Sequence, residues 1–483
     1  MASKAKSRWA DDEQDAELEA QRRKEKEEKK RLKAEKAKKL EAEKQAREAA
    51  EAAATTRRHP SPSPPETNSG HPAKRRKLSP ERGTTTTQTQ SSTTIANGTG
   101  EKTHKLLRFD GGAFRKARSV ENYDKLNDIE EGSYGWVSRA RDISTGEVVA
   151  LKRLKLNPKD RGGVPVTGLR EIQVLKACDH RNIVHLKEIV VNDDTSRLES
   201  IFLVMEFLEH DLKSILEDMP NPFLQSEIKT LLLQLAAGTA YLHENWILHR
   251  DLKTSNLLLN NRGQLKIADF GMARFVGDPP PQKLTQLVVT LWYRSPELLL
   301  GTPTYNTAVD TWSIGCIFGE LLTREPLLQG KNEVDQLTKI FELCGIPTEE
   351  TWPGFRRLPN AKGLRLPQNS TTTNSLVRAR FPTLPSAGAA LLNSLLALDP
   401  EKRPSAKQIL AHEYFKQDPK PKQEAFFPTY PSKAGQERRR KRETPNAPLR
   451  GEKAVDLGHV DFSGIFAGRE KEERGAGFAL RMV

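Results

Sequence analysis

His249-Arg-Asp-Leu-Lys-Thr-Ser-Asn256 is the stretch of this chain that says most about its fold and its chemistry. Asp269-Phe-Gly271 follows thirteen residues after Asn256, and Ser295-Pro-Glu297 comes next. A single aspartate in such a setting is most often a turn cap. Three motifs in this order and spacing are hard to obtain by chance, so we interpret them as parts of one site.

Phosphoryl transfer is the chemistry that these residue types fit. It needs a carboxylate to orient the attacking hydroxyl, oxygen ligands for Mg²⁺ and positive charge near the migrating phosphate. Asp251 supplies the orienting carboxylate, and Lys253 supplies the positive charge. Asn256 and Asp269 supply the metal ligands. The motifs therefore predict a catalytic centre that uses ATP and Mg²⁺.

A glycine-containing segment lies upstream, Ile129-Glu-Glu-Gly-Ser-Tyr-Gly-Trp-Val137. Gly132 and Gly135 allow the backbone of a hairpin to close over phosphates. Taken alone, two glycines describe an ordinary hairpin. The motifs downstream favour the phosphate-binding interpretation.

A lysine and a glutamate complete the predicted centre. Val149-Ala-Leu-Lys152 ends a strand with a lysine placed to reach the α- and β-phosphates. Glu171 is the expected partner of Lys152, because an opposite charge holds the ammonium in place. We expect Glu171 to lie on a helix whose Leu169, Ile172 and Leu175 face the core.

Apolar periodicity over residues 123–415 predicts one catalytic domain. Its first part is typical of strands, for example at residues 146–152 and 201–205. Helical spacing dominates later, for example at residues 227–241 and 311–322. We therefore predict an α+β fold in which a small β-rich lobe precedes a larger α-helical lobe.

Composition divides the chain into a charged helical extension (1–54), a disordered basic linker (55–120), the catalytic domain (121–415) and a polar C-terminal tail (416–483). In the tail, Phe426-Phe-Pro-Thr-Tyr430 offers aromatic side chains that can dock back on the domain. About +11 of the net charge of +14 lies in residues 1–120. Such an extension attracts RNA or acidic proteins, or is simply solvated, and charge alone leaves both open.

Two basic runs bear on location. Lys74-Arg-Arg-Lys77 is of the kind that nuclear import receptors bind, and residues 438–442 form a second run, so we expect a nuclear protein.

No apolar run approaches the roughly 20 residues needed to span a bilayer, so no membrane association is expected. Three widely spaced cysteines offer neither a disulfide framework nor a structural zinc site.

The chain resembles the protein kinase family, and within it the PITSLRE class of cyclin-dependent kinases. The resemblance covers most of residues 121–435. Its most specific pieces are Pro165-Val-Thr-Gly-Leu-Arg-Glu171, Glu209-His-Asp-Leu-Lys-Ser214, Asn245-Trp-Ile-Leu-His-Arg-Asp-Leu-Lys-Thr-Ser-Asn256 and Val289-Thr-Leu-Trp-Tyr-Arg294. It implies the two-lobed protein kinase fold and an ion pair between Glu297 and Arg403.

The resemblance also implies which residues form the site. The residues expected to contact ATP are Ile129, Gly132, Gly135, Val137, Ala150, Lys152, Met205, Glu206, Leu208, Asp211 and Leu258. The expected catalytic residues are Asp251, Lys253, Lys152 and Glu171, and the expected metal ligands are Asn256 and Asp269. A lysine two residues after Asp251 is the pattern of serine/threonine kinases, so aliphatic hydroxyls are the expected acceptors.

Regulatory and specificity residues follow from the same resemblance. Thr285 matches an activating phosphothreonine, and the cations expected to converge on its phosphate are Arg170, Arg250 and Arg274. Ser133 and Tyr134 match inhibitory phosphorylation sites. The residues that match a proline-directed substrate pocket are Val288, Val289 and Arg294, so Ser-Pro and Thr-Pro sites are the expected substrates.

The implied partner is a cyclin, of the L type by analogy, with a role in transcription, pre-mRNA splicing or cell-cycle control. Two alternatives come from other classes of protein. One is a pseudokinase-like scaffold, which the presence of Lys152, Asp251, Asn256 and Asp269 argues against. The other is an RNA-associated protein whose basic arm is the functional part. Salt-sensitive RNA binding by residues 1–120 is the observation that supports this second alternative.

Overall fold

The computed structural model describes residues 117–131, 135–154, 164–192, 201–277, 281, 284–286, 288–362, 364, 366 and 375–431. All of them belong to the compact unit Lys105–Val483. The predicted helical extension, nearly all of the predicted linker and both basic runs lie outside the described residues. So do Gly132, Ser133 and Tyr134.

The first lobe of this unit is an antiparallel sheet in the strand order β1-β2-β3-β5-β4. Its strands are β1 (Tyr123–Glu131), β2 (Gly135–Asp142), β3 (Val148–Leu154), β4 (Leu186–Val191) and β5 (Ile201–Glu206). The strands predicted near residues 146–152 and 201–205 are therefore confirmed. Gly135 has a structural reason here, because a Cβ atom at this position would lie 2.3 Å from the carbonyl oxygen of Arg153 in β3.

Helix α2 (Val166–Ala177) belongs to the same lobe and packs against the 3₁₀ turn η3 (Phe270–Met272). Leu175 is buried and Ile172 packs against the core, as expected, but Leu169 is 45% exposed. The expectation that Leu169 faces the core is therefore wrong. A helix advances about 100° per residue, so one that buries positions 171 and 175 turns position 169 outward.

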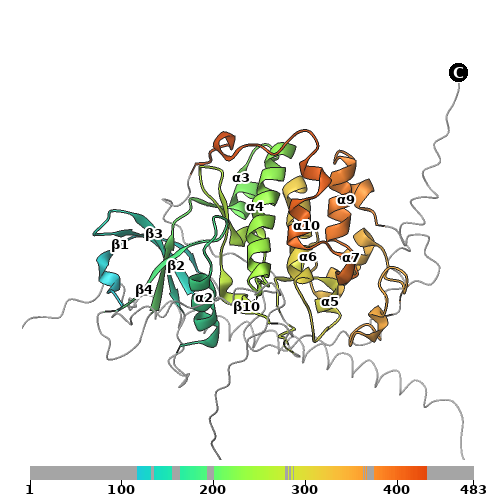
Figure 1. Ribbon diagram of the computed structural model, residues 1–483, viewed down its shortest axis with the longest axis horizontal. Helices are drawn as coiled ribbons and strands as arrows, with labels where there is room; N and C mark the ends of the chain where they lie inside the picture. Colours follow the sequence, from blue (N-terminus) through green and yellow to red (C-terminus); the bar gives the residue numbers. More distant parts are fainter. Residues whose placement is uncertain are drawn as a thin grey trace, which may run out of the picture. The chain divides into compact units, whose positions relative to one another are not determined.

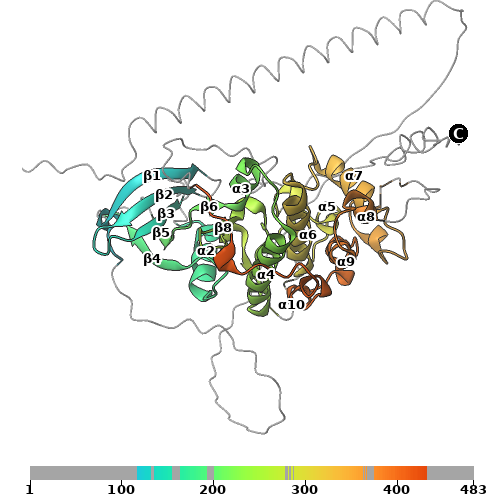
Figure 2. The same ribbon diagram turned by 90° about the horizontal axis from the view of Figure 1, so that it is seen from above.

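The second lobe is helical, as predicted, and Figures 1 and 2 show its helices beyond the sheet. The α-helices are α3 (Leu212–Asp218), α4 (Gln225–Glu244), α5 (Pro296–Leu299), α6 (Ala308–Thr323), α7 (Glu333–Cys344), α8 (Val377–Arg380), α9 (Ser386–Leu395) and α10 (Ala406–Leu410). Short 3₁₀ turns are η1 (Val120–Asn122), η2 (Thr254–Asn256), η4 (Leu291–Tyr293), η5 (Phe355–Arg357), η6 (Pro400–Lys402), η7 (Glu413–Phe415) and η8 (Glu424–Phe426). Two small sheets complete it, β6 (His210–Asp211) with β8 (Leu257–Leu259) and β9 (Leu265–Ile267), and β7 (Ile247–Leu248) with β10 (Arg274–Phe275).

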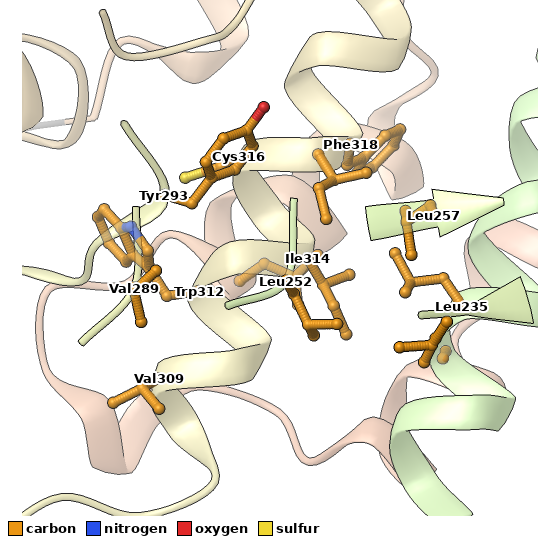
Figure 3. Packing of buried hydrophobic residues seen from close by; sticks show 14 of the residues in the cluster. Leu235, Leu252, Leu257, Val289, Tyr293, Val309, Trp312, Ile314, Cys316 and Phe318 are labelled. Carbon is orange, nitrogen blue, oxygen red and sulfur yellow. The ribbon is translucent and has the colours of Figure 1, made fainter. Parts of the chain in front are cut away.

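Helix α6 is the centre of the hydrophobic core of this lobe. Figure 3 shows Ile314 and Phe318 of α6 on the side of Leu235 and Leu257, which come from α4 and β8. Trp312 is also fully buried. Burial of a large apolar side chain contributes about 1.5–3 kcal/mol, so this cluster fixes the helix on which the catalytic segment rests. Among the described residues, no helix has the length and apolar character that crossing a membrane requires.

One buried acid on α6 leads to a prediction of pH dependence. Glu320 is 2% exposed, and its carboxylate accepts hydrogen bonds from the Thr254 hydroxyl at 2.8 Å and the Tyr293 hydroxyl at 2.7 Å. Burial raises the pKa of Glu320 to about 7, although the two hydroxyls oppose the shift. The folded state therefore binds this proton more tightly than the unfolded state does. Its contribution to the free energy of unfolding falls as the pH rises from about 4.5 to about 7.

Glu320→Gln is expected to abolish that contribution, so the variant gains stability relative to the wild type as the pH rises from 5 to 8. Denaturant unfolding at four pH values measures the difference. Glu325→Gln, on an exposed residue, is the matched control and should show no such trend. A difference between Glu320→Gln and wild type that does not change with pH would contradict the prediction.

Candidate active site

The sheet of the first lobe places four of the predicted ATP-binding residues on one face. Val137 in β2 pairs with Lys152 in β3, and Ala150 in β3 pairs with Met205 in β5. Directly opposed residues, and residues two apart on one strand, point to the same side of a sheet. The apolar side chains of Val137, Ala150 and Met205 therefore share a face with the Lys152 ammonium, as a site for a base followed by phosphates requires.

Lys152 is the centre of a three-residue charge cluster. Its Nζ lies 2.6 Å from Oε1 of Glu171 on α2 and 2.8 Å from Oδ1 of Asp269. The side chains of Lys152 and Glu171 are 8% and 2% exposed, whereas that of Asp269 is 33% exposed. One ammonium thus joins β3, α2 and the Asp-Phe-Gly turn, and only Asp269 turns part of its carboxylate toward solvent.

The electrostatics of this cluster favour the charged forms of Lys152 and Asp269. Burial opposes the charged form of each group. The attraction of Asp269 and Glu171 outweighs this for Lys152, whose pKa is raised. Lys152 in turn lowers the pKa of Asp269 to about 2, against the effect of burial. For Glu171, burial prevails and its pKa is raised. Asp269 is therefore ionised at neutral pH, as a metal ligand must be.

Asp251 is held by a network within the predicted catalytic segment. Its Oδ2 lies 2.8 Å from the Lys253 ammonium, and its Oδ1 accepts hydrogen bonds from the backbone N–H and the hydroxyl of Thr290 at 3.0 and 2.8 Å. Burial favours a higher pKa, but Lys253 and Thr290 outweigh it, so the pKa of Asp251 lies below its ordinary value. Asp251 is therefore an ionised, oriented acceptor.

The same network touches the predicted metal ligand Asn256. The Nδ2 of Asn256 donates to the carbonyl oxygen of Asp251 at 2.9 Å, which leaves the amide oxygen for another partner. Asp269 offers a carboxylate that is partly exposed. No group of three or more His, Cys, Asp and Glu residues capable of holding a metal exists among the residues that the structure describes. One amide and one carboxylate nevertheless suit Mg²⁺, which takes its remaining ligands from phosphates and water.

Two supporting residues were not predicted as part of the site. Thr290 is one, and Asp310 at the start of α6 is the other. Asp310 is 1% exposed and accepts hydrogen bonds from the backbone N–H groups of His249 and Arg250 at 3.0 and 2.9 Å, and from the His243 ring at 2.9 Å. Arg250 has a left-handed backbone with φ of 62°, and these bonds hold it there. The sequence did hold one indication of Asp310, because it is a charged residue at the start of the apolar run that forms α6.

The predicted phosphate-binding arginines are brought together. Helix α2, which carries Arg170, contacts β10, which carries Arg274, and the pKa of Arg170 is lowered by partial burial and by the like charges of Arg274 and Arg250. Thr285 is exposed, and its carbonyl oxygen accepts from the Tyr305 hydroxyl at 2.8 Å. The same hydroxyl accepts from Nη1 of Arg250 at 2.8 Å. Thr285 is thus linked to the arginine cluster through one side chain.

The predicted substrate pocket has an unusual backbone. Val289 has φ of 66°, a conformation that a β-branched residue rarely adopts. Its carbonyl oxygen accepts hydrogen bonds from Nε and Nη2 of Arg294 at 3.2 and 3.0 Å. Arg294 is buried and paired with Glu333 at 2.6 Å, and Val288 is fully buried beside it. The carbonyl of Val289 is therefore turned inward and occupied.

The remaining predicted ATP-binding residues that the structure describes lie on β1, β5, β6 and β8 and in the chain between β5 and β6. Asp211 in β6 pairs with Leu258 in β8, and Leu208 is buried between β5 and β6 along the chain. Glu206 at the end of β5 pairs with Lys266 at 2.7 Å. Ile129 lies on β1.

Comparison with known proteins agrees with this geometry. The protein kinase domain family matches residues 123–415. Cyclin-dependent kinase G-2 of Oryza sativa subsp. indica is 52% identical over 357 residues, which cover 72% of this chain and 49% of the relative. Serine/threonine-protein kinase ppk23 of Schizosaccharomyces pombe is 53% identical over 327 residues, 68% of this chain and 80% of the relative. Cyclin-dependent kinase 11B of Homo sapiens is 49% identical over 351 residues, 72% of this chain and 43% of the relative.

This chain thus spans about half the length of the rice relative and most of the length of the fission yeast relative. The family match falls on the part of the chain that carries the two lobes and the charge clusters. The chain therefore belongs to the protein kinase family and, within it, to the PITSLRE class of cyclin-dependent kinases.

Proposed function

We propose that this chain is a cyclin-dependent serine/threonine kinase that transfers the γ-phosphate of ATP to Ser-Pro and Thr-Pro sites of nuclear proteins. The observation that carries the proposal is the Asp251 carboxylate, held between Lys253 and Thr290 beside Asn256. This arrangement presents an ionised acceptor to an incoming hydroxyl and a cation to the phosphate that it attacks.

Each residue has a task in this proposal. Bound ATP would supply the transferable phosphate, and Mg²⁺ would supply positive charge that offsets the negative charge of the phosphates. Lys152, fixed by Glu171, holds the nucleotide phosphates. Asp251 orients the substrate hydroxyl and accepts its proton, and Lys253 offsets negative charge as transfer proceeds. Asn256 and Asp269 offer the oxygen atoms that would hold the metal.

The selectivity for proline has a physical basis in the left-handed Val289. A residue after the acceptor serine brings a backbone N–H toward this turn, and the nearby carbonyl of Val289 is already occupied by Arg294. A buried N–H without an acceptor costs about 1–3 kcal/mol. Proline has no N–H, so it avoids this cost.

The test is phosphate transfer from labelled ATP and Mg²⁺ to a pair of peptides that differ only in Ser-Pro against Ser-Ala. We expect kcat/KM for the Ser-Pro peptide to exceed that for the Ser-Ala peptide about tenfold to hundredfold, from the cost of the unpaired N–H. Equal kcat/KM values would contradict proline direction while leaving kinase activity intact.

A cyclin partner and a nuclear role extend the proposal. Val166 and Leu169 on α2 are 55% and 45% exposed, and an exposed apolar pair on the helix that carries Glu171 suits a partner that sets the position of α2. The same assay run with and without an L-type cyclin tests this. Activity that is unchanged by any cyclin would contradict cyclin dependence. Nucleotide binding without transfer, even in a formed complex, would favour the scaffold alternative.

A further inference from the structure

The first residues of the predicted polar tail form a strap, residues 416–431, that returns along the second lobe. In Figures 1 and 2 this orange-red segment leaves α10 and runs back past α4. Lys229 of α4 is fully buried, and its ammonium donates to the carbonyl oxygens of Gln417 and Pro419 at 2.7 and 2.8 Å. A buried ammonium needs such partners, so α4 is built to hold the strap.

The middle of the strap is fixed at two further points. The backbone N–H of Lys422 donates to the carbonyl oxygen of Ser226 at 3.1 Å, and its Nζ pairs with Glu227 of α4 at 2.8 Å. Glu424 accepts two hydrogen bonds from one guanidinium nitrogen of Arg181, at 2.7 Å each. The strap is therefore bound along its length and not only at its origin.

The end of the strap lies against the turn between β8 and β9. Gly263 in this turn has φ of 77°, and a Cβ atom there would lie 2.5 Å from the carbonyl oxygen of Glu424 and 2.7 Å from Cβ of Phe427. Phe427 is 6% exposed and lies 6.1 Å from Phe223, between ring centroids. A side chain at position 263 would therefore collide with the strap, and a glycine there lets the strap lie against the turn.

Tyr430 connects the strap to β6. Its backbone N–H donates to Oδ1 of Asn261 at 3.1 Å, and the same oxygen accepts from Nε2 of His210 at 3.1 Å. The rings of Tyr430 and His210 meet edge to face, with centroids 6.0 Å apart. His210 directly precedes Asp211 in β6, and Asp211 pairs with Leu258 in β8.

We propose that Phe427 and Tyr430 are positioning residues that hold the β6–β8–β9 sheet, and with it Asp211 and Leu258, in the geometry that binds nucleotide. The inference rests on the proposed function, which assigns Asp211 to the ribose and Leu258 to the base. The strap meets this sheet and its turn at His210, Asn261 and Gly263. Its effect on nucleotide binding is therefore transmitted through these residues. Its loss should weaken nucleotide binding more than it affects the peptide site around Val289.

The test compares neighbouring residues of the strap in the full-length chain. The dissociation constant for ADP with Mg²⁺ is measured by calorimetry, which needs no catalysis, and KM for a Ser-Pro peptide is measured separately. Phe427→Ala and Tyr430→Ala are expected to raise the dissociation constant about threefold to tenfold, as loss of an aromatic contact does. Phe426→Ala is the matched control, because Phe426 is 67% exposed, and should leave it unchanged. Tyr430→Phe keeps the ring and should restore binding.

Ile409→Ala distinguishes a positioning role of the strap from a general loss of stability. Ile409 of α10 is buried, so the variant opens a cavity and lowers the midpoint of thermal unfolding, but it leaves the contacts of the strap with β6 and with the turn after β8 in place. An ADP dissociation constant that rises as much in Ile409→Ala as in Phe427→Ala would overturn the inference. So would wild-type ADP affinity in both Phe427→Ala and Tyr430→Ala. A wild-type chain that binds no ADP would overturn the proposed function as well, so the two failures are distinguishable.

Discussion

Asp251→Asn is expected to lower kcat for phosphate transfer by roughly 10²- to 10⁴-fold, the range that a positioned proton acceptor contributes. An asparagine keeps the size of the side chain but removes the negative charge that Lys253 and Thr290 orient. The substrate hydroxyl then loses both its acceptor and its alignment. Initial rates with a saturating Ser-Pro peptide, measured with the cyclin complex, give the change in kcat.

The control must show that the variant still folds and binds nucleotide. Asp179→Asn, on an exposed aspartate away from the network, should keep full activity. Asp251→Asn should bind ADP with Mg²⁺ as the wild type does, since Lys152 and Asp269 are untouched. A kcat within tenfold of wild type would reject the assignment of Asp251.

Arg403→Met is expected to lower the free energy of unfolding by about 3–5 kcal/mol, because it leaves a buried carboxylate without its partner. Arg403 and Glu297 form a two-pronged pair at 2.7 Å, with side chains 0% and 5% exposed. The guanidinium also donates to the carbonyl oxygens of Ala308 and Ala397 and lies 4.9 Å from the ring centroid of Trp312. The pair that the family resemblance implied is therefore present, and it ties α5 to α6.

Chemical denaturation measures this change, and Lys407→Met is the matched control. Lys407 pairs with Glu244 at the same 2.7 Å, but its side chain is 74% exposed and that of Glu244 is 51% exposed. Surface pairs contribute little, because water and salt screen them. Similar losses of stability in both variants would show that burial does not govern the Arg403 pair.

Local motifs predicted the fold class and the main charged residues, because each motif carries its own chemistry within a few residues. The strands near Lys152 and the helices around α4 and α6 followed from apolar spacing. The family and its cyclin-dependent class followed from longer matches. Leu169 failed because a short helix offered several apolar residues, and spacing alone did not choose which of them is buried.

The supporting residues were beyond the reach of local patterns. Thr290 meets Asp251 across 39 positions, and Asp310 meets His249 across 61. Neither contact between residues so far apart in the sequence can be predicted without knowing how α6 packs against the catalytic segment. The aromatic segment of the tail was a candidate for docking on the domain, and Phe427 and Tyr430 do dock, but the contact of Tyr430 with His210 depends on the path of the whole strap.

The double pairing of Lys152 couples the position of α2 to the position of the Asp-Phe-Gly turn. A single ammonium has two carboxylate neighbours, Glu171 on α2 and Asp269 in the Asp-Phe-Gly turn. If either carboxylate moves away, the buried lysine loses half of its compensation, and the other contact must carry a charge that burial disfavours. Movements of α2 and of the turn are therefore thermodynamically linked. A small molecule that displaces Asp269 should weaken partner binding at α2, and a partner on α2 should weaken that small molecule by the same factor.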